Sequence, residues 1–362
     1  PDHEIRPLDF STDITKADIL FLVDLSESMA GEIQNLKDGI NNTLIGSIKS
    51  KIPDVGFGIN TFEDYDTFQN DYGTRVIQTI TTNETTLKNT MSTVNYLENT
   101  GWEPQMSAIY FSVTGEARGT TPAMDCSASE GSIGGACFRP GAMPIFIMMT
   151  DEAFETGYSK YKVGASDWIY VSTNNAIDAL NGINGKFIGV DSWNTGSFGF
   201  TPANDLKAVS NGTGSVDGAG NPFYYLINSN GTGLSTNVAT AVEYLAANVP
   251  MLVDTDRESI TNPQSVDVTQ FIKAVTPVKR VLSDTTTVNC STDCTTEAFK
   301  DVTPGTTVTF NIDFYNDFYQ PVTSQATAFR AKINVYGEGS LVDTREVYII
   351  VPGKAGGIGP GS

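Results

Sequence analysis

The sequence predicts an α/β protein with a doubly wound, mostly parallel sheet, followed by a smaller antiparallel β-sandwich. From residue 17 to about residue 249, short apolar runs alternate with helical patterns, which is typical of parallel strands covered by helices on both faces. The runs FLV (21–23) and IFIMM (145–149) are continuously apolar, as expected for strands buried on both faces. Beyond residue 250 the pattern changes to alternating Thr- and Val-rich strands, which indicates the β-sandwich.

The elements of the first part follow from this alternation. Five apolar runs predict the strands of the sheet, at 17–24, 55–62, 143–151, 186–193 and 222–229. TRVIQTIT (74–81) alternates and predicts one antiparallel edge strand. Helical periodicity predicts helices near 30–48, 84–98, 105–117, 173–183, 203–210 and 235–248.

The second part is predicted from three alternating segments, 306–317, 329–337 and 345–353, with VTPG and GEGS as turns. The segment 1–16 is too short for a domain, but its HEIRPLDF stretch can supply a strand to the sandwich. We therefore expect an α/β domain at 17–250 and a sandwich at 251–353. Residues 354–362 read as a Gly-rich linker or an artificial tail.

The charge balance limits the partners. The 362 residues include 22 basic and 42 acidic ones, and the net charge of −20 repels both nucleic acid and anionic lipid. No apolar run has the length that a membrane span needs, so we expect no direct membrane insertion by this segment.

The four cysteines form two local pairs, Cys126 with Cys137 and Cys290 with Cys294, each in a loop rich in small polar residues. Local disulfides are the favoured interpretation, and a zinc site is the minor alternative because no histidine lies near either pair. Oxidised cysteines favour an extracellular or cell-surface location. The sequence has no signal peptide and starts at Pro1, so we interpret it as a segment of a longer exported precursor.

Oxygen-bearing side chains follow the first buried strand at alternate positions. Asp24, Ser26 and Ser28 stand in LVDLSES, at the carboxyl edge where open α/β sheets bind ligands. Alternate residues of an extended segment point the same way, so the three side chains can converge on one point. Hard oxygen donors of this kind suit Mg²⁺, Mn²⁺ or Ca²⁺.

Three motifs in order resemble the von Willebrand factor type A and integrin I-domain family, which has a Rossmann-like fold. DLSES (24–28) resembles its D-x-S-x-S, TDEAF (150–154) its strand-end T-D motif, and TGWEPQMSAIYF (100–111) its second loop. The resemblance is closest to integrin β-type domains, which also place a Glu in that loop. It implies a metal-ion-dependent adhesion site with the ligands Asp24, Ser26, Ser28, Glu103 and Asp151.

The resemblance also implies a cofactor and a partner. Mg²⁺ or Mn²⁺ is expected at the primary site, with Ca²⁺ there or adjacent, and an acidic group of a protein or cell-surface ligand would complete the shell. Integrin β chains carry an acidic pair for a second cation, where this chain has Gly31 and Glu32, so Glu32 alone remains for an adjacent site. Trp102 and Glu152 flank the site as a ligand surface.

Several simpler interpretations stay open. Asp24, Ser26 and Ser28 can be a turn and helix cap, and Glu103 can be a solvated carboxylate before Pro104. A structural filament or envelope component, in which the metal only stabilises the fold, is the alternative to an adhesin. An enzyme is not expected, because the only histidine is His3 and neither Ser–His nor Cys–His schemes can be built.

Overall fold

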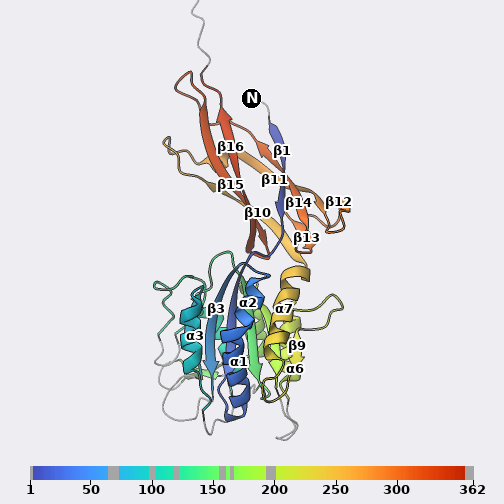
Figure 1. The fold of residues 1–362 in the computed structure, drawn as a ribbon. Helices are drawn as coiled ribbons and strands as arrows, with labels where there is room; N and C mark the ends of the chain where they lie inside the picture. Colours follow the sequence, from blue (N-terminus) through green and yellow to red (C-terminus); the bar gives the residue numbers. More distant parts are fainter. Residues whose placement is uncertain are drawn as a thin grey trace, which may run out of the picture. The chain divides into compact units, whose positions relative to one another are not determined.

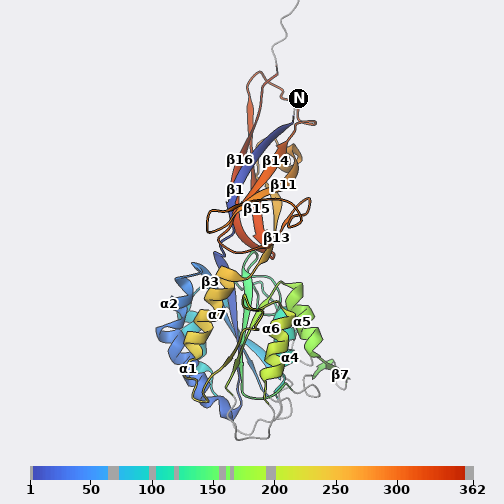
Figure 2. The same cartoon turned by 90° about the vertical axis from the view of Figure 1, so that its right-hand side faces the viewer.

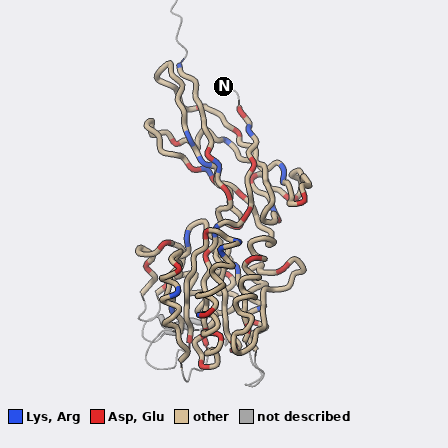
Figure 3. The backbone as a smooth tube through the Cα atoms, viewed as in Figure 1, with Lys and Arg blue, Asp and Glu red and all other residues tan. Residues whose placement is uncertain are grey.

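The computed structural model describes residues 3–63, 73–97, 103–117, 122–154, 160–163, 167–192 and 201–354. The chain divides into two compact units, Thr15–Val249 and the combination of Pro1–Ile14 with Pro250–Ser362. Figure 1 shows the α/β unit with its helices and the sandwich unit with its strands. Acidic residues lie in both units (Figure 3), so the net charge of −20 is not confined to one of them.

The α/β unit is built on a six-stranded sheet of order β4-β3-β2-β5-β8-β9. Neighbouring strands run parallel except for β4, which pairs antiparallel with β3. The predicted fold class and the predicted antiparallel edge strand are therefore confirmed. The strands are β2 (Lys16–Asp24), β3 (Asp54–Phe62), β4 (Thr74–Thr81), β5 (Met143–Thr150), β8 (Lys186–Asp191) and β9 (Tyr224–Leu226).

Helices cover both faces of this sheet, as Figure 2 shows, with α1, α2 and α7 on one face and α4, α5 and α6 on the other. A hairpin of β6 (Lys160–Val163) and β7 (Asp167–Tyr170) was not predicted. The helical segments are η1 (Glu27–Met29), α1 (Ala30–Asn42), α2 (Leu44–Lys49), α3 (Glu84–Thr93), α4 (Gln105–Thr114), α5 (Thr173–Gly182), α6 (Ala203–Gly212) and α7 (Leu234–Asn248).

Three predicted helices differ in their bounds. The segment 30–48 is two helices, because Thr43 leaves helical geometry with a φ of −133°. The helix predicted at 84–98 ends at Thr93, where Val94 turns extended. The helix predicted at 105–117 ends at Thr114, because Gly115 adopts a left-handed φ of 64° and terminates it.

The central strands are buried on both faces. Every residue of β5 is buried, as is every residue of β2 after Lys16. Leu20, Leu22, Phe146 and Met148 join Ile109 of α4 in one apolar cluster. Burial of each such side chain contributes about 1.5–3 kcal/mol, so the sheet holds the loops at its edge on a rigid base.

The sandwich unit consists of two antiparallel sheets of order β1-β14-β11-β12 and β13-β10-β15-β16. HEIRPLDF does supply a strand, since β1 pairs along its length with β14. The elements are β1 (Glu4–Ser11), β10 (Met251–Ser259), η2 (Val268–Phe271), β11 (Ile272–Val281), β12 (Thr287–Asn289), β13 (Phe299–Val302), β14 (Thr307–Phe314), β15 (Thr327–Gly337) and β16 (Ser340–Val351).

The three segments predicted in the sandwich correspond to β14, β15 and β16, whereas β10 to β13 were not predicted individually. Of the predicted tail 354–362, only Lys354 lies within the described residues. None of the helices in the described ranges combines the length and the apolarity needed to cross a membrane.

Candidate functional site

Asp24 closes the first strand of the sheet at its carboxyl edge. It is the last residue of β2, which lies between β3 and β5, and its side chain is fully buried. One carboxylate oxygen accepts the backbone N–H of Ser26 at 2.8 Å, and the other accepts the hydroxyl of Thr150 at 2.6 Å. Burial, and then the negative charge of Asp151, raises the pKa of Asp24 to about 7.

The two serines connect Asp24 to the end of β5. The hydroxyls of Ser26 and Ser28 lie 3.2 Å apart, and Ser28 donates to Oδ1 of Asp151 at 3.1 Å. Ser26 is buried, Ser28 is exposed and Asp151 is half-buried. The structure therefore brings four predicted ligands into one network that runs from the core to the surface.

The serine hydroxyls make no capping hydrogen bond. Ser26 is the N-cap of η1 and Met29 that of α1, and neither side chain caps its helix with a hydrogen bond. The hydroxyl of Ser26 contacts that of Ser28, which donates to Asp151. The turn of the simpler interpretation is present, since Asp24 accepts the backbone N–H of Ser26, whereas its side-chain cap is not formed.

Glu103 is buried beside the same carboxylates. It precedes Pro104, the N-cap of α4, and is only 2% exposed, so the solvated carboxylate considered from the sequence is wrong. Its Oε1 has no hydrogen-bond partner. Burial, followed by the charges of Asp24, Glu152 and Asp151, raises the pKa of Glu103 to about 10. A carboxyl group in this environment stays protonated at neutral pH unless a cation compensates its charge.

Glu32 is buried in the first turn of α1. It is 1% exposed, and among the described residues the hydroxyl of Ser192 is the polar side chain that faces its carboxylate, without forming a hydrogen bond of good geometry. Burial raises the pKa of Glu32 to about 7. A Cβ on the preceding Gly31 would lie 2.8 Å from the carbonyl oxygen of Ser229, so glycine is what lets this turn approach the loop before α7.

The acidic residues of the rim lie close together without a positively charged partner in the described residues. We name Asp24, Ser26, Ser28, Glu103 and Asp151 the rim cluster. In the described part of the chain, no Lys, Arg or His forms an ion pair with its three acids or with Glu32. Buried charges are normally paired or bound to a metal, so these carboxylates need either protons or a cation.

The donor types of the rim cluster fit a hard divalent cation, and the unpartnered oxygen of Glu103 supports that fit. The described residues nevertheless contain no group of three or more His, Cys, Asp or Glu side chains that is already arranged around one ion. The serines and Asp151 satisfy one another by hydrogen bonds instead.

Two rim residues were not assigned a role from the sequence. Thr150 holds Asp24 through its hydroxyl, and its place directly before Asp151 was the available signal. Gln105 is fully buried, donates from its Nε2 to the backbone carbonyl of Glu152 at 3.3 Å, and has an unpartnered Oε1. Glu152 itself is half-buried, and Trp102 lies outside the described residues.

Both predicted disulfides are formed, Cys126 with Cys137 and Cys290 with Cys294. The minor alternative of a zinc site is therefore wrong, because each thiol is taken up in a bond. His3 belongs to the sandwich unit, where it bonds Asp313 at 2.8 Å and stacks on Tyr315.

Comparison with known proteins gives distant structural neighbours. No family model and no curated protein matches the sequence. The pilus adhesin SpaC from Lactobacillus rhamnosus GG is similar with a TM-score of 0.42 and 11% identity, over 98% of this chain and 47% of the adhesin. A von Willebrand factor type A protein from Catenulispora acidiphila is similar with a TM-score of 0.39 and 10% identity, over 96% of this chain and 73% of that protein.

The chain thus spans about half the length of the pilus adhesin. With TM-scores below 0.5, these neighbours carry no argument about function or about the site, which depends on the contacts described above.

Proposed function

We propose that the rim cluster binds one divalent cation and that the chain, through this cation, binds an acidic group of a protein or cell-surface partner. The observation that supports the proposal best is the convergence of Asp24, Ser26, Ser28 and Asp151 in one network, near the buried Glu103 whose Oε1 has no hydrogen-bond partner among the described residues. Mg²⁺ or Mn²⁺ suits this oxygen donor set, and Ca²⁺ is the alternative.

The division of the rim cluster into a buried and an exposed half supports a role in binding. Asp24 and Glu103 are almost completely buried, whereas Ser28 is exposed and Asp151 is half-buried. The buried acids would hold the ion, and a partner would reach it from the side of Ser28 and Asp151. A purely structural ion needs no such open side.

Charge supports the requirement for a cation between the chain and an acidic partner. The rim acids and the net charge of −20 repel a carboxylate that approaches without a cation. Glu32 is the residue that would hold an adjacent second cation, since both of its oxygens are buried and neither forms a hydrogen bond of good geometry within the described residues.

The two disulfides support an extracellular or cell-surface location. A role as an adhesin follows from the family that the motifs resemble. In the alternative, a structural component, the ion would stabilise the α/β unit without meeting a partner.

The test is calorimetric titration of Mg²⁺, Mn²⁺ and Ca²⁺ into chelator-stripped protein. We expect saturable binding that Asp24→Ala and Asp151→Ala both lose. Asp38→Ala removes an exposed acid of α1 and serves as the matched control with unchanged binding. Equal binding by the parent and Asp24→Ala would refute the site.

A second step separates binding from structural support. A short peptide that contains aspartate, titrated into the cation-loaded protein, should bind and should lose binding in chelator. If the cation binds and raises thermal stability but the peptide shows no cation-dependent binding, the structural role is correct.

A further inference from the structure

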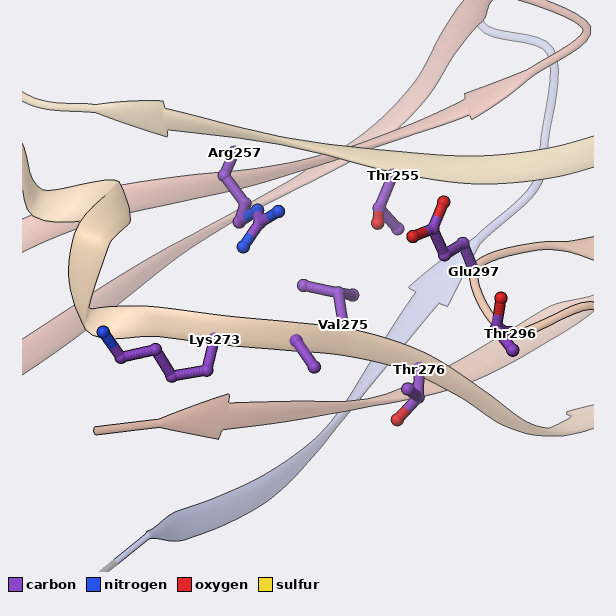
Figure 4. Close-up of a pocket in the computed structure, with 8 residues that line it drawn as sticks. Thr255, Arg257, Lys273, Val275, Thr276, Thr296 and Glu297 are labelled. Atoms are coloured by element: carbon purple, nitrogen blue, oxygen red, sulfur yellow. The ribbon is translucent and has the colours of Figure 1, made fainter.

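A polar groove lies between β10 and β11 in the sandwich unit. Its volume is about 300 Å³, and it is independent of the rim cluster. Figure 4 shows Thr255 and Arg257 directed from β10 toward β11, and Val275 directed from β11 toward β10. Lys273, Thr276 and Glu297 also line the groove.

The groove lies where both sheets lack an outer strand. The short β13 pairs with β10 only at Met251 and Val253. The short β12 pairs with β11 only at Lys279–Val281. Among the described residues, the stretch of β10 after Val253 therefore has a strand neighbour on one side only, which is β15.

The backbone of β10 presents free hydrogen-bonding groups to this side. The backbone N–H of Ile260 donates to the carbonyl of Arg330, and the carbonyl of Leu252 accepts from the N–H of Glu338. The backbone N–H and C=O groups of the even-numbered residues of β10 therefore point toward β15. Groups alternate in an antiparallel strand, so the N–H and C=O of Thr255 and Arg257 point to the open side. No backbone partner takes up either residue in the described ranges. Four to five residues of an added strand, about 14–17 Å, would fit there.

The side chains of β10 change character along the same face. Met251 and Val253 point inward and are buried, but the next two inward positions hold Thr255, which is half-buried, and Arg257, which is exposed. An apolar core therefore gives way to a polar, open-sided groove at this point.

Arg257 is the unpaired cation of the groove, and in the described residues Glu297, which lines the same groove, has no ion-pair partner either. Its guanidinium bonds the carbonyl of Ile272 at 2.6 Å, which uses one of five N–H donors. No carboxylate in the described part of the chain pairs with it. Lys273, in contrast, is paired with Asp317 at 2.7 Å.

We propose that the open edge of β10 accepts an extended peptide segment of a partner protein, which adds as a strand beside Thr255 and Arg257 and places an acidic side chain on the Arg257 guanidinium. Main-chain hydrogen bonds supply affinity in this mode, and the side-chain contact supplies specificity. A carboxylate is the chemistry that Arg257 selects, because guanidinium binds it through parallel hydrogen bonds. The opposite role for Arg257 is an inward-pointing charge that prevents edge pairing, and the experiment separates the two.

The experiment uses the full chain and two labelled hexapeptides, one of alternating Glu and Val and one of alternating Lys and Val. Fluorescence anisotropy measures affinity, and hydrogen exchange reports protection of the segment 254–259. We expect the Glu peptide to bind, to protect this segment, and to bind at least tenfold more tightly than the Lys peptide.

Two variants test the contacts. Arg257→Gln should lower the affinity for the Glu peptide at least tenfold. Arg330→Gln removes an arginine of β15 that is paired with Glu346 of β16, and it should leave this affinity unchanged. Thr255→Pro removes the N–H that points to the open side. The Glu peptide should then no longer protect the segment 254–259 from hydrogen exchange, while the amides of β15 stay protected.

The proposal is overturned if neither peptide protects 254–259, since the edge is then closed by its own charge. It is also overturned if both peptides bind equally, or if Arg257→Gln and Arg330→Gln have the same effect.

Discussion

The strand β2 carries a fully buried aspartate near each end, and the two are satisfied in opposite ways. Asp18, near the start of the strand, accepts from Arg139 twice, from Nε at 2.7 Å and from the backbone N–H at 2.6 Å. Asp24, at its end, accepts only from a hydroxyl and a backbone N–H. Arg139 supplies a cation at one end of the strand, and no Lys, Arg or His of the described residues pairs with Asp24 at the other.

The difference is visible in how each carboxyl group titrates. Burial raises the pKa of Asp18, but the hydrogen bonds and charge of Arg139 oppose that rise. Burial and the charge of Asp151 act in the same direction on Asp24. The first aspartate belongs to a structural ion pair, and the second is a ligand of the cation that we propose. The rim cluster and the Asp18–Arg139 pair can therefore be tested against each other.

The largest expected effect comes from breaking the pair. Arg139→Met removes the guanidinium that compensates the buried charge of Asp18 and leaves the backbone N–H of residue 139 as its donor. The free energy of unfolding should fall by about 3–5 kcal/mol, measured by urea denaturation. Added Mg²⁺ should not restore the loss. Asp54→Asn changes a second, more exposed partner of Arg139 and is the control, with an effect below about 1 kcal/mol. A loss of similar size in both variants would contradict the assignment.

A cation should stabilise the other end of the strand. At about one hundred times its Kd, a divalent cation that binds only the folded chain should raise the free energy of unfolding by about 2.7 kcal/mol. Asp24→Asn should lose this gain, and Arg139→Met should keep it. The two aspartates are six residues apart on one strand, about 20 Å, so their effects should add. Loss of the gain in Arg139→Met would show that the two ends are coupled.

Without a cation, the rim should make the protein less stable as pH rises. The folded-state pKa values of Asp24 and Glu103 are raised to about 7 and about 10, so the folded chain keeps protons that the unfolded chain releases above about pH 4. The free energy of unfolding in chelator should then fall by about 1.4 kcal/mol per pH unit for each retained proton, between about pH 4 and 7 for Asp24.

Urea denaturation at pH 5, 6 and 7 in chelator measures this slope. A saturating cation should reduce the slope, because it replaces the retained protons. A slope that is the same in the parent and in Asp24→Asn would contradict the raised pKa of Asp24.

The sequence predicted the rim better than the Asp18–Arg139 pair, for a physical reason. Asp24, Ser26 and Ser28 are consecutive alternate positions after an apolar run, so their convergence depends on local geometry. Arg139 lies 121 residues from Asp18 in a loop without periodicity, and only the tertiary fold brings the two together. The break at Thr43 and the bounds of β12 and β13 depend on packing and were likewise not predictable from periodicity.

Burial was the property of the rim that the sequence could not provide. Glu103 before Pro104 is compatible with a solvated carboxylate, and Ser26 is compatible with a helix cap. The structure shows Glu103 to be buried, and it shows the hydroxyl of Ser28 bonded to Asp151. The motif therefore predicted that Asp24, Ser26, Ser28 and Asp151 lie together, and no Lys, Arg or His of the described residues pairs with these acids.

The smallest expected effect on stability gives the sharpest test of Glu103. Because its pKa is about 10, the side chain is protonated at pH 7 without a cation, and Glu103→Gln replaces it with a neutral group of the same shape. The free energy of unfolding in chelator should change by less than about 1 kcal/mol. The affinity for Mg²⁺ should fall about tenfold, because the amide cannot supply the charge that the ion requires, and this corresponds to about 1.4 kcal/mol.

Calorimetry in buffers of different ionisation enthalpy adds a readout that a merely structural residue would not change. The parent should release a proton from Glu103 when the ion binds, and Glu103→Gln should release one proton fewer. If the variant binds Mg²⁺ as tightly as the parent and releases as many protons, Glu103 is not a ligand. The rim would then resemble the other end of β2, with a buried carboxyl group that the fold itself accommodates.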